Sequence, residues 1–173
     1  MQTTAQWLQG VLASTTRMTH WLSRQYVGEA LAASRIAALA KTAPEKHRPS
    51  LAKIAEDEAR HSTMVQGLLT SRGIPLPTVD YTHDRYWSQV LEADMDFDDV
   101  AAAGHHAEEM RLVRIRALST TEEVPSDIRA VFAAILGDEE WHAAAFAQMT
   151  NPAALAEAEA NHQKGMEALG LLL

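Results

Sequence analysis

The chain has 173 residues, a length that one domain can fill with its own hydrophobic core. Its 47% apolar fraction is rich in alanine and poor in strand-forming residues, and cysteine is absent, which excludes disulfides, thiolate metal sites and a catalytic thiol. The net charge of −8 disfavours nucleic acid and anionic membranes as partners. With no membrane-spanning run and no signal peptide, we expect a cytoplasmic protein. The one basic stripe, which we interpret as a solvated helix face, comprises Arg111, Arg114 and Arg116.

Apolar residues recur at helical spacing along most of the chain and predict four long helices, at about 14–42, 50–71, 97–118 and 126–149. A short turn around Trp7 and Leu8 precedes them. Ser50 is the expected N-cap of the second helix, and Gly73 the glycine that ends it. The connection over residues 74–96 is expected to hold a short helix at 84–93. Asn151-Pro152 ends the fourth helix, and a last short helix follows over 157–169.

Two helical hairpins joined by one long connection are typical of a ferritin-like four-helix bundle. We therefore predict an all-α fold of that type, with a long crossover between the second and third long helices and a short C-terminal helix. A single domain is expected over residues 1–173, with the core of the bundle at about 14–150.

One five-residue motif occurs twice, at matching places in the two predicted hairpins. Residues 57–61 read Asp-Glu-Ala-Arg-His, and residues 138–142 read Asp-Glu-Glu-Trp-His. In each copy Glu and His lie three residues apart, so both project from one helix face, and that face is the apolar one. The other two long helices each place one glutamate in the apolar stripe. Because buried carboxylates are costly unless they are compensated, we predict six metal ligands: Glu29, Glu58, His61, Glu108, Glu139 and His142.

The predicted ligands indicate which metal the site would hold. Four carboxylates balance the charge of two divalent ions, and each ion receives one imidazole. Oxygen donors with a single nitrogen favour two iron ions over tetrahedral zinc and leave positions open for dioxygen, although manganese, or one ion of each, would suit the same donors. One Glu on each of two helices and Glu-x-x-His on the other two is the pattern of di-iron carboxylate proteins.

Further residues are candidates for supporting roles. Metal-bound histidines usually donate their second N–H to a carboxylate, so Asp138 is predicted to orient His61 and Asp57 to orient His142. A solvent-facing side chain is the alternative for Asp57. Two residues are candidates for catalytic roles, and each lies one turn before a predicted ligand glutamate. The alternatives for His105 are an additional ligand, a proton donor or a core histidine. The alternatives for Tyr26 are a phenol near the metals or a core residue. Glu109 would replace Glu108 if the helix phase were shifted by one residue.

Over residues 14–150 the chain resembles the ferritin-like di-iron carboxylate superfamily. Gly28-Glu29 followed by Arg35, and then Asp57-Glu58-x-x-His61, resembles the first hairpin of rubrerythrins, and residues 104–108 resemble their third helix. Histidine stands at position 105, where that family has glutamate, and the rubredoxin module is absent. The ligand spacing is also similar to that of the aldehyde-deformylating oxygenases, the quinone hydroxylases and the tRNA hydroxylases of the superfamily.

This resemblance implies an oxidoreductase that activates dioxygen or peroxide at a di-iron centre and oxidises a small organic substrate with external electrons. Glu58 and Glu139 would bridge the two ions. The alternative is a ferritin-like or rubrerythrin-like protein that binds iron or scavenges peroxide without an organic substrate. We expect a monomer or homodimer for the enzyme and a cage of many subunits for a storage protein. Acidic charge disfavours RNA modification. The small residues that would leave room for an apolar substrate channel are Ala32, Ala33, Ala101 and Ala143.

Overall fold

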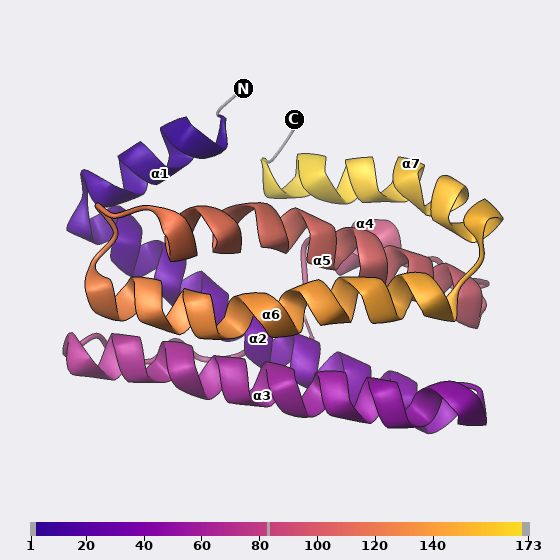
Figure 1. Cartoon of the computed structure of the whole chain (residues 1–173). Helices are drawn as coiled ribbons and strands as arrows, with labels where there is room; N and C mark the ends of the chain where they lie inside the picture. Colours follow the sequence, from indigo (N-terminus) through magenta and orange to yellow (C-terminus); the bar gives the residue numbers. More distant parts are fainter. Residues whose placement is uncertain (1–2, 83, 171–173) are drawn as a thin grey trace.

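The computed structural model describes residues 3–82 and 84–170, and all regular secondary structure in these ranges is helical (Figure 1). The predicted all-α fold class is therefore confirmed. The four long helices are α2 (Thr15–Thr42), α3 (Arg48–Ser71), α5 (Phe97–Thr120) and α6 (Ser126–Met149). The shorter elements are α1 (Thr4–Leu12), the 3-10 turn η1 (Glu45–His47), α4 (Trp87–Val90) and α7 (Pro152–Leu169).

The long helices pack as two hairpins. Helix α2 lies against α3, α5 lies against α6, and α3 meets α6 between the two pairs. A long connection over residues 72–96 leads from one hairpin to the other, and its short helix α4 packs against α7. Helices α1 and α7 both contact α5 and lie along the top of Figure 1. The central turns of the four long helices are therefore packed against other helices.

The four long helices share a seven-residue pattern that places one glutamate each between two buried apolar residues. Seven residues are about two helical turns, so such residues lie on one face. All of these positions are buried: Leu22, Glu29 and Ile36 in α2, Leu51, Glu58 and Val65 in α3, Ala101, Glu108 and Ile115 in α5, Phe132, Glu139 and Phe146 in α6. The apolar residues form separate clusters on either side. A layer of carboxylates therefore crosses an otherwise apolar interior.

Several helix ends differ from the sequence-based expectation. The expected turn near Trp7 is the longer helix α1, which begins with a capping box of Thr3 and Gln6. Helix α3 begins at Arg48 rather than after Ser50, because Pro49 is accommodated in its first turn. Gly73, at φ +66°, follows the end of α3 as predicted. Local interactions at the helix ends thus shift the boundaries of the predicted helices but leave the order of the elements along the chain unchanged.

The C-terminal half shows two larger differences. The short helix expected at 84–93 covers only Trp87–Val90, since Asp84 accepts from the backbone N–H groups of Tyr86 and Trp87 and forms a turn instead. Helix α7 begins at Pro152, not at 157. Asn151 caps it by accepting from the backbone N–H groups of residues 153 and 154 at 3.0 Å. Asn-Pro here starts a helix as well as ending one.

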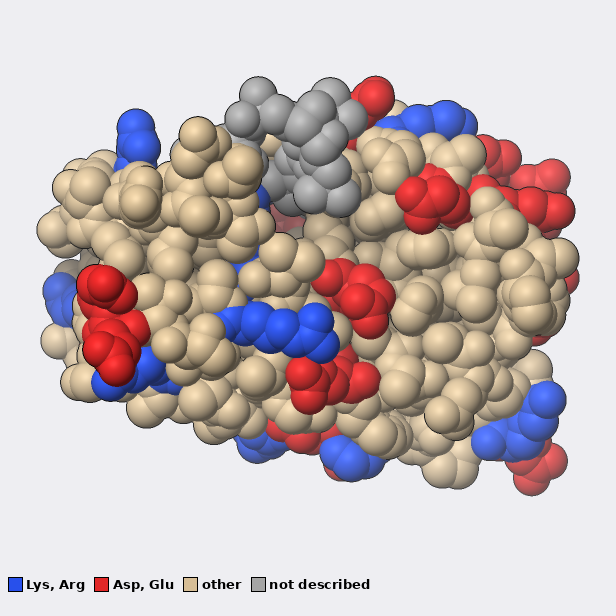
Figure 2. All heavy atoms as spheres, turned by 45° about the horizontal axis from the view of Figure 1, so that its top comes forward, with Lys and Arg blue, Asp and Glu red and all other residues tan. Residues whose placement is uncertain are grey.

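The surface has mixed charge. The face shown in Figure 2 carries acidic and basic side chains next to one another, with several carboxylates gathered toward one end. Of the helices in the described ranges, none combines the length and the apolar character needed to cross a membrane.

Helix α7 approaches the connection closely at Gly165. A Cβ atom there would lie 2.6 Å from the Tyr86 ring and 2.7 Å from a Val90 methyl group. We expect Gly165→Ala to lower the free energy of unfolding by about 1–3 kcal/mol through overpacking, measured by urea denaturation. Gly137→Ala is the control, because its Cβ meets no atom within 4 Å and alanine favours a helix by up to about 1 kcal/mol. Equal stability of the two variants would contradict this close packing.

Candidate metal centre

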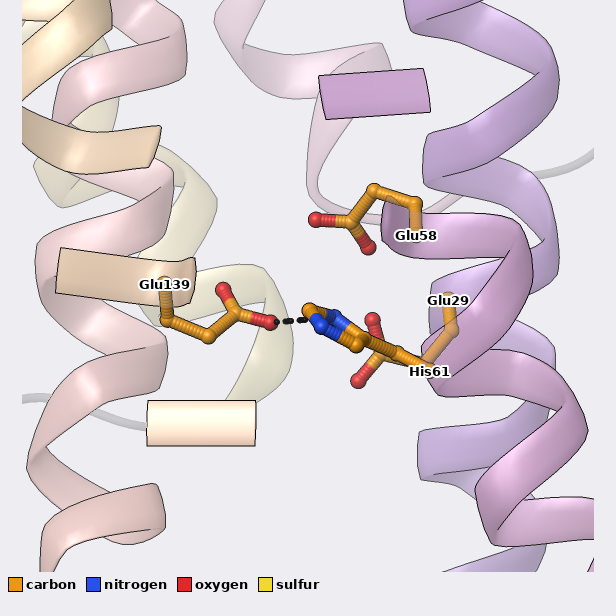
Figure 3. Close-up of side chains that lie close together, drawn as sticks. All are labelled: Glu29, Glu58, His61 and Glu139. Carbon is orange, nitrogen blue, oxygen red and sulfur yellow. Dashed lines mark ion pairs between the residues drawn. The ribbon is translucent and has the colours of Figure 1, made fainter. Parts of the chain in front are cut away.

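The structure brings the six predicted ligand side chains together in the carboxylate layer. Glu29 comes from α2 and Glu108 from α5, while α3 and α6 each supply a glutamate and a histidine. All six are buried, and the most accessible, Glu108, is 4% exposed. Their donor atoms form two groups, with all atoms of a group within 4.8 Å of one another: Glu29, Glu58, His61 and Glu139, and Glu58, Glu108, Glu139 and His142. Figure 3 shows the first group, with Glu139 facing Glu58 and His61 from the opposite helix.

Two aspartates hold the outer nitrogens of the imidazoles. Asp138 Oδ2 lies 3.3 Å from His61 Nε2, and Asp57 Oδ2 lies 3.3 Å from His142 Nε2, the two pairings that the sequence predicts. Arg60 joins the aspartates by donating to Asp138 at 2.7 Å and to Asp57 at 3.0 Å. Burial pushes the pKa of Asp57 up, but hydrogen bonds from neighbouring cations and from His142 outweigh it and lower that pKa to about 2. The ionised aspartate therefore accepts the Nε2 proton.

The inner nitrogens of the two imidazoles face carboxylate oxygens. His61 Nδ1 lies 3.1 Å from Glu139 Oε1, as Figure 3 shows, and His142 Nδ1 lies 3.2 Å from Glu58 Oε1. A neutral imidazole that donates from Nε2 carries a lone pair at Nδ1. Two lone pairs at this distance repel each other unless a proton or a metal cation lies between them. Within the described ranges, both Nδ1 atoms and Glu139 Oε2 are buried without a hydrogen-bond partner. This donor set fits divalent cations.

Arg111 also reaches the carboxylate layer, so its interpretation as part of a solvated helix face is wrong. Its side chain is 19% exposed, and its guanidinium enters from α5. It contacts all four buried glutamates: Glu29, both carboxylate oxygens of Glu58 at 3.5 and 3.4 Å, Glu108 at 3.4 Å and Glu139 at 3.3 Å. A sequence signal for this existed, because Arg111 follows Glu108 by three residues and so shares its helix face. The chain thus places one fixed positive charge among its four glutamates.

The carboxylates respond differently to this shared environment. Burial raises the pKa of Glu29 and of Glu108 well above its ordinary value, although Arg111 opposes the shift. Burial also raises the pKa of Glu58. For Glu139 burial acts in the same direction, but Arg111 and the facing imidazoles outweigh it and hold the pKa at about 2. The environment therefore favours the protonated form of three of these glutamates and the ionised form of Glu139.

The remaining candidate residues lie outside the two donor groups. His105 Nδ1 lies 2.9 Å from the carbonyl oxygen of Ala143, to which it donates across the α5–α6 contact. Tyr26 is half-buried and packs against the apolar cluster of which Leu22 is a member. Glu109 is exposed, so Glu108 is the glutamate of α5 that faces the layer. In the described part of the chain, neither His105 nor Tyr26 contributes an atom to either group.

A cavity of about 920 Å³ adjoins the carboxylate layer between α2 and α5. Glu108 and Arg111 line it together with three small residues, Gly28, Ala32 and Gly104. Ala32 is one of the residues that the sequence analysis associates with a substrate channel. Among the four glutamates of the layer, Glu108 faces this cavity, while apolar clusters cover the layer along the helix axes.

Comparisons with known proteins provide no relative for this chain. No protein-family model matches its sequence, and no curated protein or solved structure matches it. Its function must therefore be inferred from the geometry and chemistry of the carboxylate layer.

Proposed function

We propose that this chain is a ferritin-like four-helix bundle, with a crossover between α3 and α5, that binds two iron ions and activates dioxygen to oxidise a small organic substrate. The observation that supports this most strongly is the overlap of the two donor groups, which share Glu58 and Glu139 and contain one imidazole each. Shared carboxylates suit bridging positions between two ions. Glu29 would then accompany one ion and Glu108 the other.

Ferrous ions bound here would supply electrons and open coordination positions for dioxygen. The chain's own residues would prepare that chemistry. Asp138 and Asp57 keep the imidazole Nδ1 atoms unprotonated and directed inward. The apolar clusters above and below keep water away from the layer, which strengthens electrostatic interactions within it. Glu29 and Glu108, whose pKa values are raised by burial, would release protons as cations bind.

The adjoining cavity favours an organic substrate over a role in iron storage alone. Its volume of about 920 Å³ lies in the range of small-molecule sites, about 300–1,000 Å³. Glu108 and Arg111 line the cavity, so a molecule held there would lie beside the proposed metal centre. A storage or peroxide-scavenging protein needs no such space for an organic molecule.

Oxygen uptake tests this proposal. Protein loaded anaerobically with ferrous iron and supplied with an external reductant is expected to consume dioxygen. Glu108→Gln should slow that uptake about 100-fold, since loss of even an outer hydrogen-bonding partner of a ligand costs about 10–100-fold. Glu109→Gln, the exposed neighbour on the same helix, should leave it unchanged.

Two results would overturn the proposal. One is uptake that is equal in Glu108→Gln and the parent protein, which would place the chemistry elsewhere. The other is a cage of many subunits in size-exclusion chromatography, which would favour storage over an enzyme that acts on an organic substrate.

A further inference from the structure

The cavity beside the carboxylate layer is elongated. Residues of α2 line it from His20 to Leu39, over successive turns of one helix face. At about 1.5 Å per residue this stretch is roughly 28 Å long. The two residues that line it at the level of the carboxylate layer, Glu108 and Arg111, belong to α5. An occupant that filled the cavity would therefore be extended and would pass the proposed metal centre along its length.

The two ends of the cavity differ in polarity. Toward the end of α2 the lining includes the apolar side chains of Ile36, Leu39, Val100 and Phe146, beside Arg35, whose charge is paired with Asp84. Toward the start of α2 it includes Arg24 and, from the long connection, Arg85. The cavity thus combines a hydrocarbon-like wall at one end with guanidinium groups at the other.

The guanidinium groups at the polar end lack anionic partners. Arg35, farther along the same wall, forms an ion pair with Asp84 at 2.6 Å and stacks on Trp87. By contrast, neither Arg24 nor Arg85 has an ion pair with any described residue. Both residues are exposed, but partial burial of the Arg24 side chain and the charge of Arg85 lower the pKa of Arg24, so the two cations lie close enough to repel each other. An anion between them would relieve that repulsion.

We infer that this cavity binds a straight-chain carboxylic acid, with the carboxylate at Arg24 and Arg85 and the hydrocarbon tail along Ile36, Leu39 and Val100. This inference rests on the proposed function and names the substrate class of the same site. In this arrangement, the part of the ligand's hydrocarbon chain next to its carboxylate lies opposite Glu108, and the rest of the hydrocarbon tail extends past Glu108. Guanidinium groups pair well with carboxylates through parallel hydrogen bonds. The two arginines would therefore bind the carboxylate end of the acid and set its orientation in the cavity.

Calorimetric titration of the metal-free protein with dodecanoate tests the inference. We expect dodecanoate to bind, and dodecanol, which lacks the charge, to bind at least tenfold more weakly. Arg24→Gln and Arg85→Gln should each weaken dodecanoate binding about tenfold or more, the effect of losing a hydrogen bond to a charged group. Leu39→Gln should weaken the binding of octadecanoate, whose tail is long enough to reach Leu39 from Arg24, and should leave that of the shorter dodecanoate unchanged. Arg116→Gln, an exposed arginine paired with Glu140 at the far side of α5, is the matched control and should bind as the parent does.

The inference is wrong if dodecanol binds as tightly as dodecanoate, or if both arginine variants retain the parent's affinity. Thermal unfolding of each variant shows that the fold is kept. Because the titration uses no metal and no oxygen, it fails or succeeds independently of the oxygen-uptake experiment. A protein that takes up no dioxygen but binds dodecanoate through Arg24 would contradict the proposed function and leave the ligand assignment standing.

Discussion

Replacing Arg111 by methionine is expected to lower the free energy of unfolding of the metal-free protein at neutral pH by about 3–5 kcal/mol, the usual cost of removing one partner from a buried set of charges. The guanidinium contacts four buried glutamates, and methionine fills similar space without charge. With divalent metal bound, the same substitution should cost far less, because the ions supply the missing positive charge. Urea denaturation with and without metal measures both values.

The pH dependence of this effect has a definite sign. Without Arg111 the pKa values of the glutamates would rise further in the folded state. The variant should therefore become less stable relative to the parent as the pH rises. Below the ordinary glutamate value of 4.5 the unfolded chain takes up protons and the difference from the parent should begin to shrink, but it should disappear only near pH 2, where Glu139 of the folded parent is protonated too. Arg116→Met, which removes only an exposed ion pair, should cost less than about 1 kcal/mol. Destabilisation of Arg111→Met that is unaffected by metal would show that Arg111 does not compensate the layer's charge.

Glu58→Ala is expected to abolish binding of both ions, because Glu58 belongs to both donor groups. Glu29→Ala removes a donor from one group only and should leave one ion bound. Anaerobic titration calorimetry with ferrous iron or Mn²⁺ gives the stoichiometry, expected to be two in the parent, one in Glu29→Ala and none in Glu58→Ala. Glu56→Ala, an exposed carboxylate on the same helix, is the matched control. Two ions bound by Glu58→Ala would remove the basis for a shared carboxylate.

The same titrations should report proton release. Burial raises the pKa of Glu29 and Glu108, so these groups bind protons more tightly in the metal-free protein than an exposed carboxyl group does, and cations compete with those protons. Metal affinity should therefore fall as the pH is lowered. The heat of binding should also depend on the ionisation enthalpy of the buffer.

Much of the carboxylate layer was accessible from the sequence because each ligand glutamate interrupts a regular apolar pattern. Glu29 stands between Leu22 and Ile36 in the buried stripe of α2. A carboxylate is buried at such a position only where other groups compensate the cost of removing its charge from water. Pairing the two aspartates with the histidines of the opposite hairpin needed only the symmetry of the repeated motif. These inferences depend on helix periodicity, which is the strongest local signal that a sequence carries.

Other features depend on side-chain reach and on tertiary contacts, which periodicity does not report. Arg111 lies on the same face as Glu108, yet a long flexible side chain at such a position can equally turn outward to solvent. His105 shares that face too, but its ring turns to a carbonyl group of α6 instead. The cavity between α2 and α5 depends on how far apart two hairpins pack, and no local pattern encodes that distance.

The two hairpins contribute equally to the carboxylate layer, and this has a mechanical consequence. Helices α2 and α3 supply three of the six candidate ligands, and α5 and α6 supply the other three. Each donor group contains residues from both hairpins. Ions bound there would act as cross-links between the two halves of a chain that has no cysteine. They would join distant segments as a disulfide does in a secreted protein, but reversibly, and from the centre of the interface.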